Sequence, residues 1–425
     1  MNSLSAIQGE KGFMQININR LLQDIEKYAQ YGQTNGGGIT RPSFSEADHA
    51  VRSMFIRELK ELGLDITIDG AANIWARRKG NGKKQGSIVI GSHLDTVPNG
   101  GKYDGALGVL MAKEIMTTII ENNIHLNYDL EIVSFTAEES NDFQLSTFGS
   151  RAFAGKLQAN QLSKVRNSAG ALLSDELEKA GGGLEQFPAM ADMKAEKKAF
   201  LELHIEQGKR LENENVSIAV IDRVVGTYRS KVSVFGQANH SGTTMMNSRK
   251  DALTASAEMI LTVEKNCCNH QGVVGTVGQL SVFPNSPNII PGQADFTLEI
   301  RGESDEQINK AIKRIEETWN IIADKRNVSI KQEPFLNQQP ILLDEELVTI
   351  VKQAAKQLEE PCLVLPSMAV HDAAHMSAVA KSVMVFVKSI EGKSHCPEEY
   401  SRQEDIEKAG NLLLHTIVKV DQQLT

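Results

Sequence analysis

The chain is poor in cysteine and carries more acid than base. Four cysteines in 425 residues are too few for the disulfide framework of a small secreted protein, so we expect a reduced environment. The 45 Lys and Arg residues are outnumbered by 54 Asp and Glu residues. The resulting formal net charge of -9 argues against a nucleic-acid-binding protein, which usually has a basic excess.

Long apolar runs are also missing. No run approaches the roughly 20 residues that a membrane helix needs. The first 15 residues, MNSLSAIQGEKGFMQ, lack the apolar core of a secretion signal. We therefore expect a cytoplasmic protein that binds neither membranes nor nucleic acid.

The remaining composition is that of a globular protein. Hydrophobic residues make up 41% and charged residues 23%, which excludes the disordered and fibrous classes. At roughly 150 residues per domain, the length predicts two or three domains with a large buried core.

Helical periodicity and short β-branched apolar runs alternate in the first half of the chain. Helices are expected at 15–31, 44–63 and 106–121, and strands at 65–74, 87–92, 130–136 and 200–204. Such alternation predicts a mainly parallel α/β sheet. Ligands of these sheets bind beyond the carboxyl ends of the strands.

The pattern changes between residues 222 and 334. Strands at 228–236, 272–283, 293–301 and 327–333, with helices at 250–264 and 306–323, give the β-α-β-β-α-β order of the ferredoxin-like split unit. Later residues return to the first pattern, with a helix at 344–359, a strand at 382–387 and a C-terminal helix. We therefore expect a catalytic α/β domain of residues 1–221 and 335–425, interrupted by an inserted α+β domain of residues 222–334.

Imidazoles and carboxylates stand at the ends of the expected strands. They are His93, Asp104 in a Gly-rich turn, the pair Glu138-Glu139, His204 and, after the last strand, His395. Such groups suit Zn²⁺, Mn²⁺ or Co²⁺, and two ions fit if one carboxylate bridges them. Two neighbouring ions can activate a water molecule and polarise a carbonyl. Taken singly, Asp104 could simply stabilise a turn, and Glu138-Glu139 could be solvent-exposed surface acids. A chance arrangement that places all of these groups at strand ends is much harder to obtain.

Motifs spread along almost the whole chain carry a family resemblance. They are GSHLDTVPNGGKYDGALGV (91–109), FTAEES (135–140), FGSRAFAG (148–155), LHIEQGKRLE (203–212), GQANHSGTTMM (236–246), RKDAL (249–253), PNSPNIIPG (284–292), LEIR (298–301), HDAAHM (371–376) and SHCPEE (394–399). This combination resembles the M20-type dinuclear metallohydrolases, and within them the group of N-carbamoyl-L-amino acid hydrolase, allantoate amidohydrolase and β-ureidopropionase. His204 marks this group, because peptidase-type relatives usually carry a carboxylate there.

The resemblance implies which residues hold the metals. His93, Asp104 and His204 would bind one divalent ion, and Asp104, Glu139 and His395 the other, with Asp104 bridging. The two ions of each subunit would be Zn²⁺, or Mn²⁺, Co²⁺ or Ni²⁺.

Two further carboxylates receive roles from the resemblance. Asp95 would accept the second imidazole N–H of His93 and fix its tautomer. Glu138 would be the general base that takes a proton from water and passes it to the leaving nitrogen. The alternative for Glu138 is a spare surface acid.

The resemblance also implies substrate contacts. His240 would hydrogen-bond the substrate carbonyl or developing oxyanion, and Asn288 with Arg301 would hold the substrate carboxylate. Gln207 would contact the carbamoyl end, and His371 would support the pocket. The alternatives are a structural loop histidine for His240 and an ordinary salt bridge for Arg301.

The resemblance implies an amidohydrolase that cleaves the carbamoyl C–N bond of N-carbamoyl-L-amino acids, giving amino acid, CO₂ and ammonia. Its substrate would be a small ureido compound bearing a carboxylate. Allantoate amidohydrolase is the nearest alternative; a dipeptidase or aminoacylase is more distant because of His204. A non-catalytic binding paralogue would be expected to lose Glu138 or a ligand, and all are kept. The resemblance further implies that the inserted domain is a lid that pairs two subunits in a homodimer.

Overall fold

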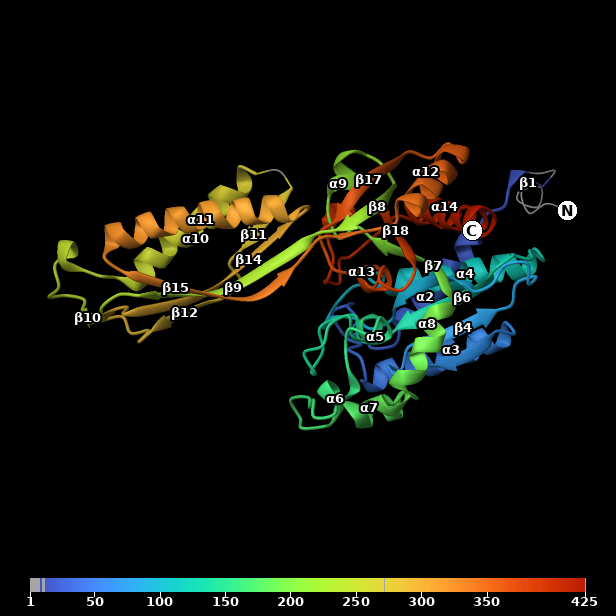
Figure 1. The fold of residues 1–425 in the computed structure, drawn as a ribbon, viewed down its shortest axis with the longest axis horizontal. Helices are drawn as coiled ribbons and strands as arrows, with labels where there is room; N and C mark the ends of the chain where they lie inside the picture. The colour runs from blue at the N-terminus through green and yellow to red at the C-terminus, as the bar shows by residue number, and fades with distance from the viewer. Residues whose placement is uncertain (1–7, 10–11, 271, 425) are drawn as a thin grey trace. The chain divides into compact units, whose positions relative to one another are not determined.

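The computed structural model describes residues 8–9, 12–270 and 272–424, which divide into two compact units (Figure 1). The first unit contains the described residues up to Asp222, Leu343–Leu365 and those from His371 onward. The second contains Arg223–Leu342 and Pro366–Val370. Within the described ranges, no helix combines the length and apolar character needed to cross a bilayer.

A twisted sheet forms the centre of the first unit, with strand order β8-β18-β7-β5-β6-β4-β3. The four central strands, β18, β7, β5 and β6, run parallel, whereas β8 is antiparallel to β18, and β4 is antiparallel to both of its neighbours, β6 and β3. Two further strands, β16 (Ile341–Leu342) and β17 (Cys362–Ser367), pair with β8. The strands are β3 (Asp65–Ile68), β4 (Ile74–Arg78), β5 (Ser87–His93), β6 (Asp129–Phe135), β7 (Lys197–Ile205), β8 (Ile218–Val224) and β18 (Lys381–Val387). The prediction of an α/β fold with a mostly parallel central sheet is confirmed.

Helices cover both faces of this sheet. In β5, Ile88 and Ile90 pack into one apolar cluster and Val89 into another, because successive side chains of a strand point to opposite faces. The first cluster includes α2 (Ile18–Ala29), α3 (Glu46–Glu61), α4 (Ala106–Glu121), α12 (Glu345–Gln357) and α14 (Gln403–Gln423). The second includes α5 (Phe148–Phe153), α6 (Ala159–Leu162), α7 (Leu173–Lys179), α8 (Met190–Glu196) and α13 (Ala373–Met376). Burial on both faces explains why the central strands are continuous apolar runs.

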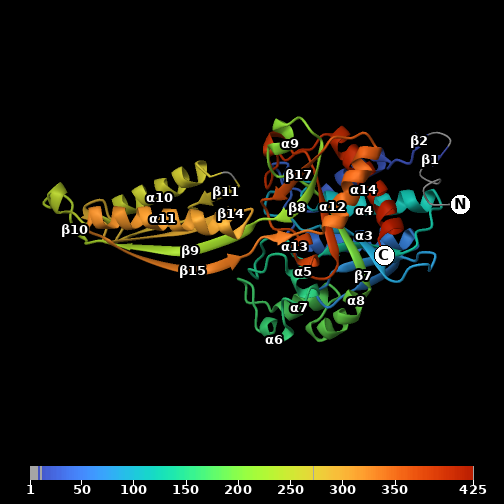
Figure 2. The ribbon, with the colours of Figure 1, turned by 45° about the horizontal axis from the view of Figure 1, so that its top comes forward.

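The second unit is an antiparallel sheet with two helices on one face (Figure 2). Its elements are β9 (Gly226–Phe235), α10 (Ala252–Cys268), β11 (Val273–Thr276), β12 (Leu280–Phe283), β14 (Gln293–Gly302), α11 (Asp305–Arg326) and β15 (Ser329–Gln338). Burial alternates residue by residue along β14, so that Phe296 and Leu298 point into the core beneath Trp319 of α11. A small ribbon pairs β10 (Asn239–His240) with β13 (Ile289–Ile290).

The structure differs from the expected elements at several places. The strand expected at 65–74 is two strands, β3 and β4, because Asp69 accepts N–H groups of Ala71 and Asn73 in a tight turn between them. The strand expected at 272–283 is divided into β11 and β12, which both pair with β14. The strand expected at 327–333 continues to Gln338 in β15, and the second unit extends to Leu342. Strands β8 and β17 (Cys362–Ser367) and the helices between 148 and 196 were not predicted from the sequence.

Candidate metal centre

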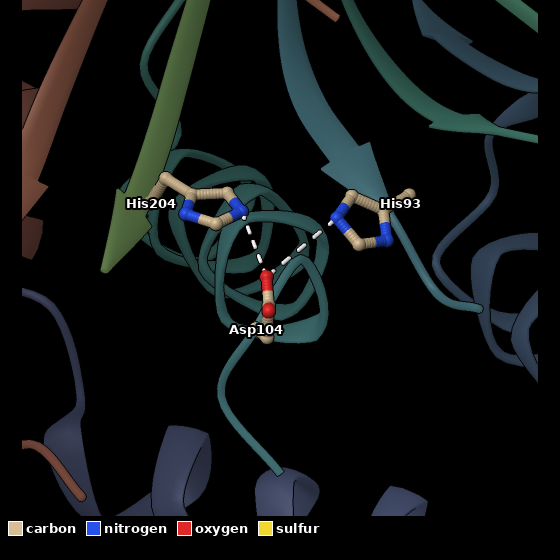
Figure 3. A group of neighbouring side chains, drawn as sticks. All are labelled: His93, Asp104 and His204. Atoms are coloured by element: carbon tan, nitrogen blue, oxygen red, sulfur yellow. Dashed lines mark ion pairs between the residues drawn. The ribbon is translucent and has the colours of Figure 1, made fainter. Parts of the chain in front are cut away.

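Two histidines stand at the ends of neighbouring parallel strands. His93 is the last residue of β5, and His204 lies one residue before the end of β7. Parallel strands present their carboxyl ends at the same edge of a sheet, so both rings lie over that edge (Figure 3). Each side chain is only 1% exposed.

Asp104 lies between the two rings, in the turn that connects β5 to α4 (Figure 3). Its Oδ1 atom is 3.1 Å from His204 Nε2 and 3.9 Å from His93 Nε2. The next residue, Gly105, has φ +62°, and a Cβ atom there would overlap the His93 ring. Glycine is therefore required for the turn to bring Asp104 this close to the histidines.

The tautomers of both rings follow from their hydrogen bonds. His93 Nδ1 lies 3.0 Å from the Asp95 carbonyl oxygen, and His204 Nδ1 lies 3.0 Å from the Ile205 carbonyl oxygen. A carbonyl can only accept, so each Nδ1 donates and, in the neutral ring, the Nε2 lone pair faces Asp104. His204 Nε2 is buried and, although Asp104 Oδ1 lies 3.1 Å away, it makes no hydrogen bond of good geometry within the described residues. Two acceptors that face each other in this way are arranged to share a cation.

The second oxygen of Asp104 contributes to another cluster. His395 Nε2 lies 3.0 Å from Asp104 Oδ2 and 3.3 Å from Glu139 Oε1. His93, Asp104 and His204 thus form one group of converging donors, and Asp104, Glu139 and His395 form a second. The donor atoms of each group lie within 4.8 Å of one another. Three imidazoles and two carboxylates fit two divalent cations that share Asp104.

The electrostatics of the cluster also favour cations. Burial lowers the pKa of His93, but the surrounding carboxylates of Glu138, Asp95 and Asp104 outweigh it and raise that pKa well above its ordinary value. Hydrogen bonds to Asp104 and Glu139 raise the pKa of His395 to about 10. The carboxylates that hold protons on these rings would equally attract metal ions.

Glu138 and Asp95 lie beside the first donor group. Glu138 Oε2 is 3.6 Å from His93 Nε2, and burial raises the pKa of Glu138 well above its ordinary value despite the nearby His93. The Asp95 carboxylate accepts the backbone N–H groups of Glu138 and Glu139 at 3.3 and 3.1 Å. It lies 3.5 Å from His93 Nδ1, farther than the Asp95 carbonyl oxygen. Asp95 therefore contacts His93 mainly through its main chain, and its carboxylate holds the two glutamates.

Gln207 and His371 are also brought to this centre. Gln207 has φ +58°, and its Nε2 atom donates to Asp104 Oδ2 at 2.9 Å. The His371 ring is buried, and its centroid lies 4.4 Å from that of His204. Burial and the neighbouring His204 hold the pKa of His371 well below its ordinary value, which keeps this ring neutral.

His240, Asn288 and Arg301 belong to the second unit. His240 Nδ1 accepts the Gly242 N–H at 3.0 Å, so the proton of the neutral ring is on Nε2, and the residue is exposed. The Asn288 carbonyl accepts the Ser241 N–H at 3.0 Å, which joins Asn288 to the His240 loop.

Arg301 is held by a side chain and by a loop. Its Nε atom donates to Glu299 Oε1 at 2.8 Å, and one terminal nitrogen donates to the Met368 carbonyl at 2.7 Å. Glu299 also accepts from Arg229 at 2.5 Å, so two guanidinium groups share one carboxylate. This cluster keeps a net positive charge that suits an anion.

Two supporting carboxylates, Glu202 and Glu399, were not predicted from the sequence. Glu202 is fully buried and accepts from Ser92 Oγ at 2.7 Å and from the Ala373 N–H at 2.9 Å. Burial and the charge of Glu202 raise the pKa of Asp372 to about 8. Glu399 contacts the turn that carries Asp104. Glu202 precedes His204 by two residues and so shares its side of β7, a weak signal that sequence alone could have supplied.

Known proteins are similar to this chain in fold and sequence over nearly their full length. The model of peptidase family M20/M25/M40 matches residues 89–419. An N-carbamoyl-L-amino acid amidohydrolase of Geobacillus stearothermophilus is 35% identical over 406 residues, which cover 95% of this chain and 98% of that protein. The allantoate amidohydrolase of Bacillus subtilis (strain 168) is 30% identical over 404 residues, which cover 95% of this chain and 97% of that protein. A crystal structure of an amidase of the hydantoinase/carbamoylase family from Burkholderia multivorans has a TM-score of 0.88 at 30% identity and covers 96% of this chain and 98% of its own.

Proposed function

We propose that this chain, which belongs to peptidase family M20/M25/M40, is a cytoplasmic enzyme that hydrolyses the carbamoyl C–N bond of N-carbamoyl-L-amino acids. The products would be the amino acid, CO₂ and ammonia. The observation that carries this proposal is the pair of donor groups sharing Asp104, with the buried Glu138 beside them. Relatives with this chemistry in their names are 31–35% identical over nearly the whole chain.

The proposed centre holds two divalent ions, Zn²⁺ or alternatively Mn²⁺, Co²⁺ or Ni²⁺. When bound, such ions supply the positive charge that activates a water molecule and polarises the carbonyl of the scissile bond. His93, Asp104 and His204 would bind one ion, and Asp104, Glu139 and His395 the other.

Glu138 is the proposed general base. Its carboxylate accepts the proton of the attacking water and then delivers it to the leaving nitrogen. Because burial raises its pKa, the protonated form that must be reached during turnover is accessible. Asp95 would position Glu138 by holding its backbone N–H.

The second unit would supply the contacts that recognise the substrate. The exposed Nε2–H of His240 would donate to the carbonyl oxygen as negative charge develops on it. Arg301 and Asn288 would bind the carboxylate. In the first unit, Gln207 would bind the carbamoyl group and His371 would support the pocket. We propose that the second unit acts as a lid, so that substrate binding energy assembles the complete site.

Allantoate is the alternative substrate. The Bacillus subtilis relative named allantoate amidohydrolase is 30% identical over nearly the full chain, close to the identity of the carbamoylase relatives. Both substrates carry a ureido group and a carboxylate, so the centre described above serves either reaction.

An ammonia-release screen tests the proposal. The metal-loaded protein would be assayed with N-carbamoyl-L-amino acids, allantoate, 3-ureidopropionate and dipeptides, and we expect the highest kcat/KM for an N-carbamoyl-L-amino acid. Activity should vanish with a chelator and return with a divalent ion, and Asp104→Ala should bind neither ion because both share this ligand. Full turnover of the metal-free protein, or a preference for dipeptides, would refute the proposal.

A further inference from the structure

Glu399 links two segments that carry metal-centre residues and lie far apart in the sequence. Its Oε1 atom accepts the backbone N–H groups of Tyr103 and Asp104 at 2.9 and 3.0 Å. Its Oε2 atom lies 3.0 Å from the hydroxyl of Ser394, the residue before His395. One carboxylate therefore contacts both the turn of Asp104 and the loop of His395.

The contact is tight and buried. Glu399 is only 4% exposed, and a Cβ atom on Gly101 would overlap its carboxylate. The Ser394 hydroxyl also lies 3.2 Å from Asp104 Oδ2, the oxygen that faces His395. Ser394 therefore contacts both Glu399 and Asp104 Oδ2, one of the candidate ligand atoms of the second group.

His395 needs such support more than the other two histidines do. His93 and His204 are buried at the ends of central strands, and each is paired in a ladder that fixes its backbone, His93 opposite Phe135 and His204 opposite Phe386. His395 follows no strand directly, has φ +57° and keeps a side chain that is 50% exposed. A non-glycine residue with positive φ is maintained only when its surroundings determine it.

We propose that Glu399 is a positioning residue for the second metal ion, acting by holding the Asp104 turn and the His395 loop at a fixed separation. The proposal rests on the dinuclear centre of the proposed function. Glu399 itself is not a ligand, since its two oxygens are engaged by the Tyr103 and Asp104 N–H groups and by Ser394. The first ion, between His93 and His204, depends on the strands and should be affected less.

Metal titration of Glu399→Ala tests this role. Metal-free protein would be titrated with Zn²⁺ by calorimetry and with Co²⁺ by absorption, and the ions retained after dialysis would be counted by mass spectrometry. We expect the dissociation constant of the second ion to rise about 10–100-fold, the usual effect of losing a group that orients a metal ligand. The affinity for the first ion should fall by a clearly smaller factor, because His93 and His204 are held by the sheet and only Asp104 is shared.

Two variants make the comparison specific. Glu398→Ala removes an equal charge from the exposed neighbouring residue and should leave both affinities unchanged. Glu399→Gln keeps a carbonyl oxygen that can accept from the Tyr103 and Asp104 N–H groups, so it should restore most of the affinity for the second ion. Thermal unfolding of each metal-free variant would establish that the fold is intact, and Glu399→Gln provides the comparison if the alanine variant fails to fold.

The outcomes separate this proposal from the proposed function. Wild-type protein that takes up no second ion would refute the dinuclear centre itself. Wild-type protein that binds two ions, with Glu399→Ala matching Glu398→Ala in both affinities, would overturn the positioning role alone. An equal loss of affinity for both ions in Glu399→Ala would also overturn the positioning role.

Discussion

Glu138 and Glu139 are adjacent in the chain and equally buried, yet they face different partners. Glu138 Oε2 lies 3.6 Å from His93 Nε2, whereas Glu139 Oε1 lies 3.3 Å from His395 Nε2. The preceding Ala137 has φ +55°, and the Asp95 carboxylate accepts hydrogen bonds from the backbone N–H groups of both Glu138 and Glu139. The backbone turn therefore assigns neighbouring identical side chains to the two sides of Asp104.

Glu138→Gln should separate chemistry from metal binding. The amide keeps the size of the side chain but cannot accept the proton of the attacking water, so we expect both ions to be retained and kcat to fall about 10²–10⁴-fold. Metal content and steady-state kinetics measure the two effects. A near-normal kcat in this variant would mean that the base is another group.

Arg301→Ala should weaken binding of substrates that carry a carboxylate. Loss of a charge-assisted pair costs about 2–5 kcal/mol where the partner charge is left buried, so KM should rise steeply while metal content stays constant. Arg301→Lys should recover only part of the loss, because an ammonium group cannot reproduce the two parallel hydrogen bonds of a guanidinium.

An amide analogue of the substrate carboxylate is the control for Arg301. Wild-type protein should hydrolyse the analogue poorly, and Arg301→Ala should reduce this rate little further. If the variant slows hydrolysis of the acid and of the amide equally, then Arg301 has a structural role through its hydrogen bonds to Glu299 and Met368 and does not bind the substrate carboxylate.

At the scale of single elements, the start of α4 illustrates how a helix terminus serves the centre. Gly105→Ala should displace either His93 or the Asp104 turn, because the new methyl group would overlap the imidazole. We expect loss of the ions bound through Asp104, measured as metal content after dialysis. Gly82→Ala is the matched control, since Gly82 also has positive φ (+77°) but nothing within 4 Å. Retention of two ions in Gly105→Ala would contradict this account.

Three helices on one face of the sheet are joined by an ion cluster. Lys113 of α4 lies 2.9 Å from Asp24 of α2 and also pairs with Glu58 of α3. Burial alone would raise the pKa of Glu58, but hydrogen bonds from Lys113 and Lys27 outweigh it and lower that pKa. The cluster therefore stabilises the ionised form of Glu58 in the folded protein.

Glu58→Gln should remove a pH-dependent part of the stability. A carboxyl with a lowered pKa contributes stability above its unfolded pKa of about 4.3, and this contribution is lost as the pH falls through the folded pKa. We expect the variant to lose about 1–3 kcal/mol of unfolding free energy at pH 7. In urea unfolding, the difference from wild type should shrink as the pH falls below about 4. A difference that stays constant from pH 7 to pH 3 would contradict the role of Glu58.

The elements that sequence predicted well share a local cause. The central strands β5, β6 and β7 are short apolar runs because both of their faces are buried, and polar residues follow each run where the strand ends. The candidate metal ligands at the ends of these strands could therefore be placed without a structure.

The features that sequence did not predict depend on distant partners. Strand β8 pairs with β18, more than 160 residues later in the chain, and no local pattern marks that pairing. The hydrogen bond from the Tyr103 N–H to Glu399 joins residues 296 positions apart. The SHCPEE motif contains Glu399, but spacing alone could not connect it to Asp104.

At the scale of the whole molecule, exposed apolar side chains are concentrated in the second unit. Within the described ranges, every large apolar side chain that is exposed lies in this unit, except Val364 and Tyr400. Leu261 of α10 and Ile321 of α11 are 63% and 67% exposed. Such a concentration is typical of a surface that contacts another protein.

We expect a homodimer formed through residues 222–334. Light scattering at assay concentration should give twice the mass of the chain, and a double variant, Leu261→Asp with Ile321→Asp, should shift the protein towards monomer if these helices form the contact. A wild-type monomer would contradict the expectation, whereas a dimer that survives the double variant would show that Leu261 and Ile321 do not form the contact.

The strand order of the first unit also has a consequence for protein synthesis. Strands β7 and β8 follow one another in the chain, yet they are separated in the sheet by β18. While the ribosome makes the second unit, the edge of β7 that will receive β18 therefore has no partner, and unpaired edges invite misassembly. His395 emerges later still, after β18. The residues of the first candidate group, His93, Asp104 and His204, are accordingly synthesised long before His395 of the second. If the two groups bind ions as proposed, the nascent chain would be able to bind the first ion before the second.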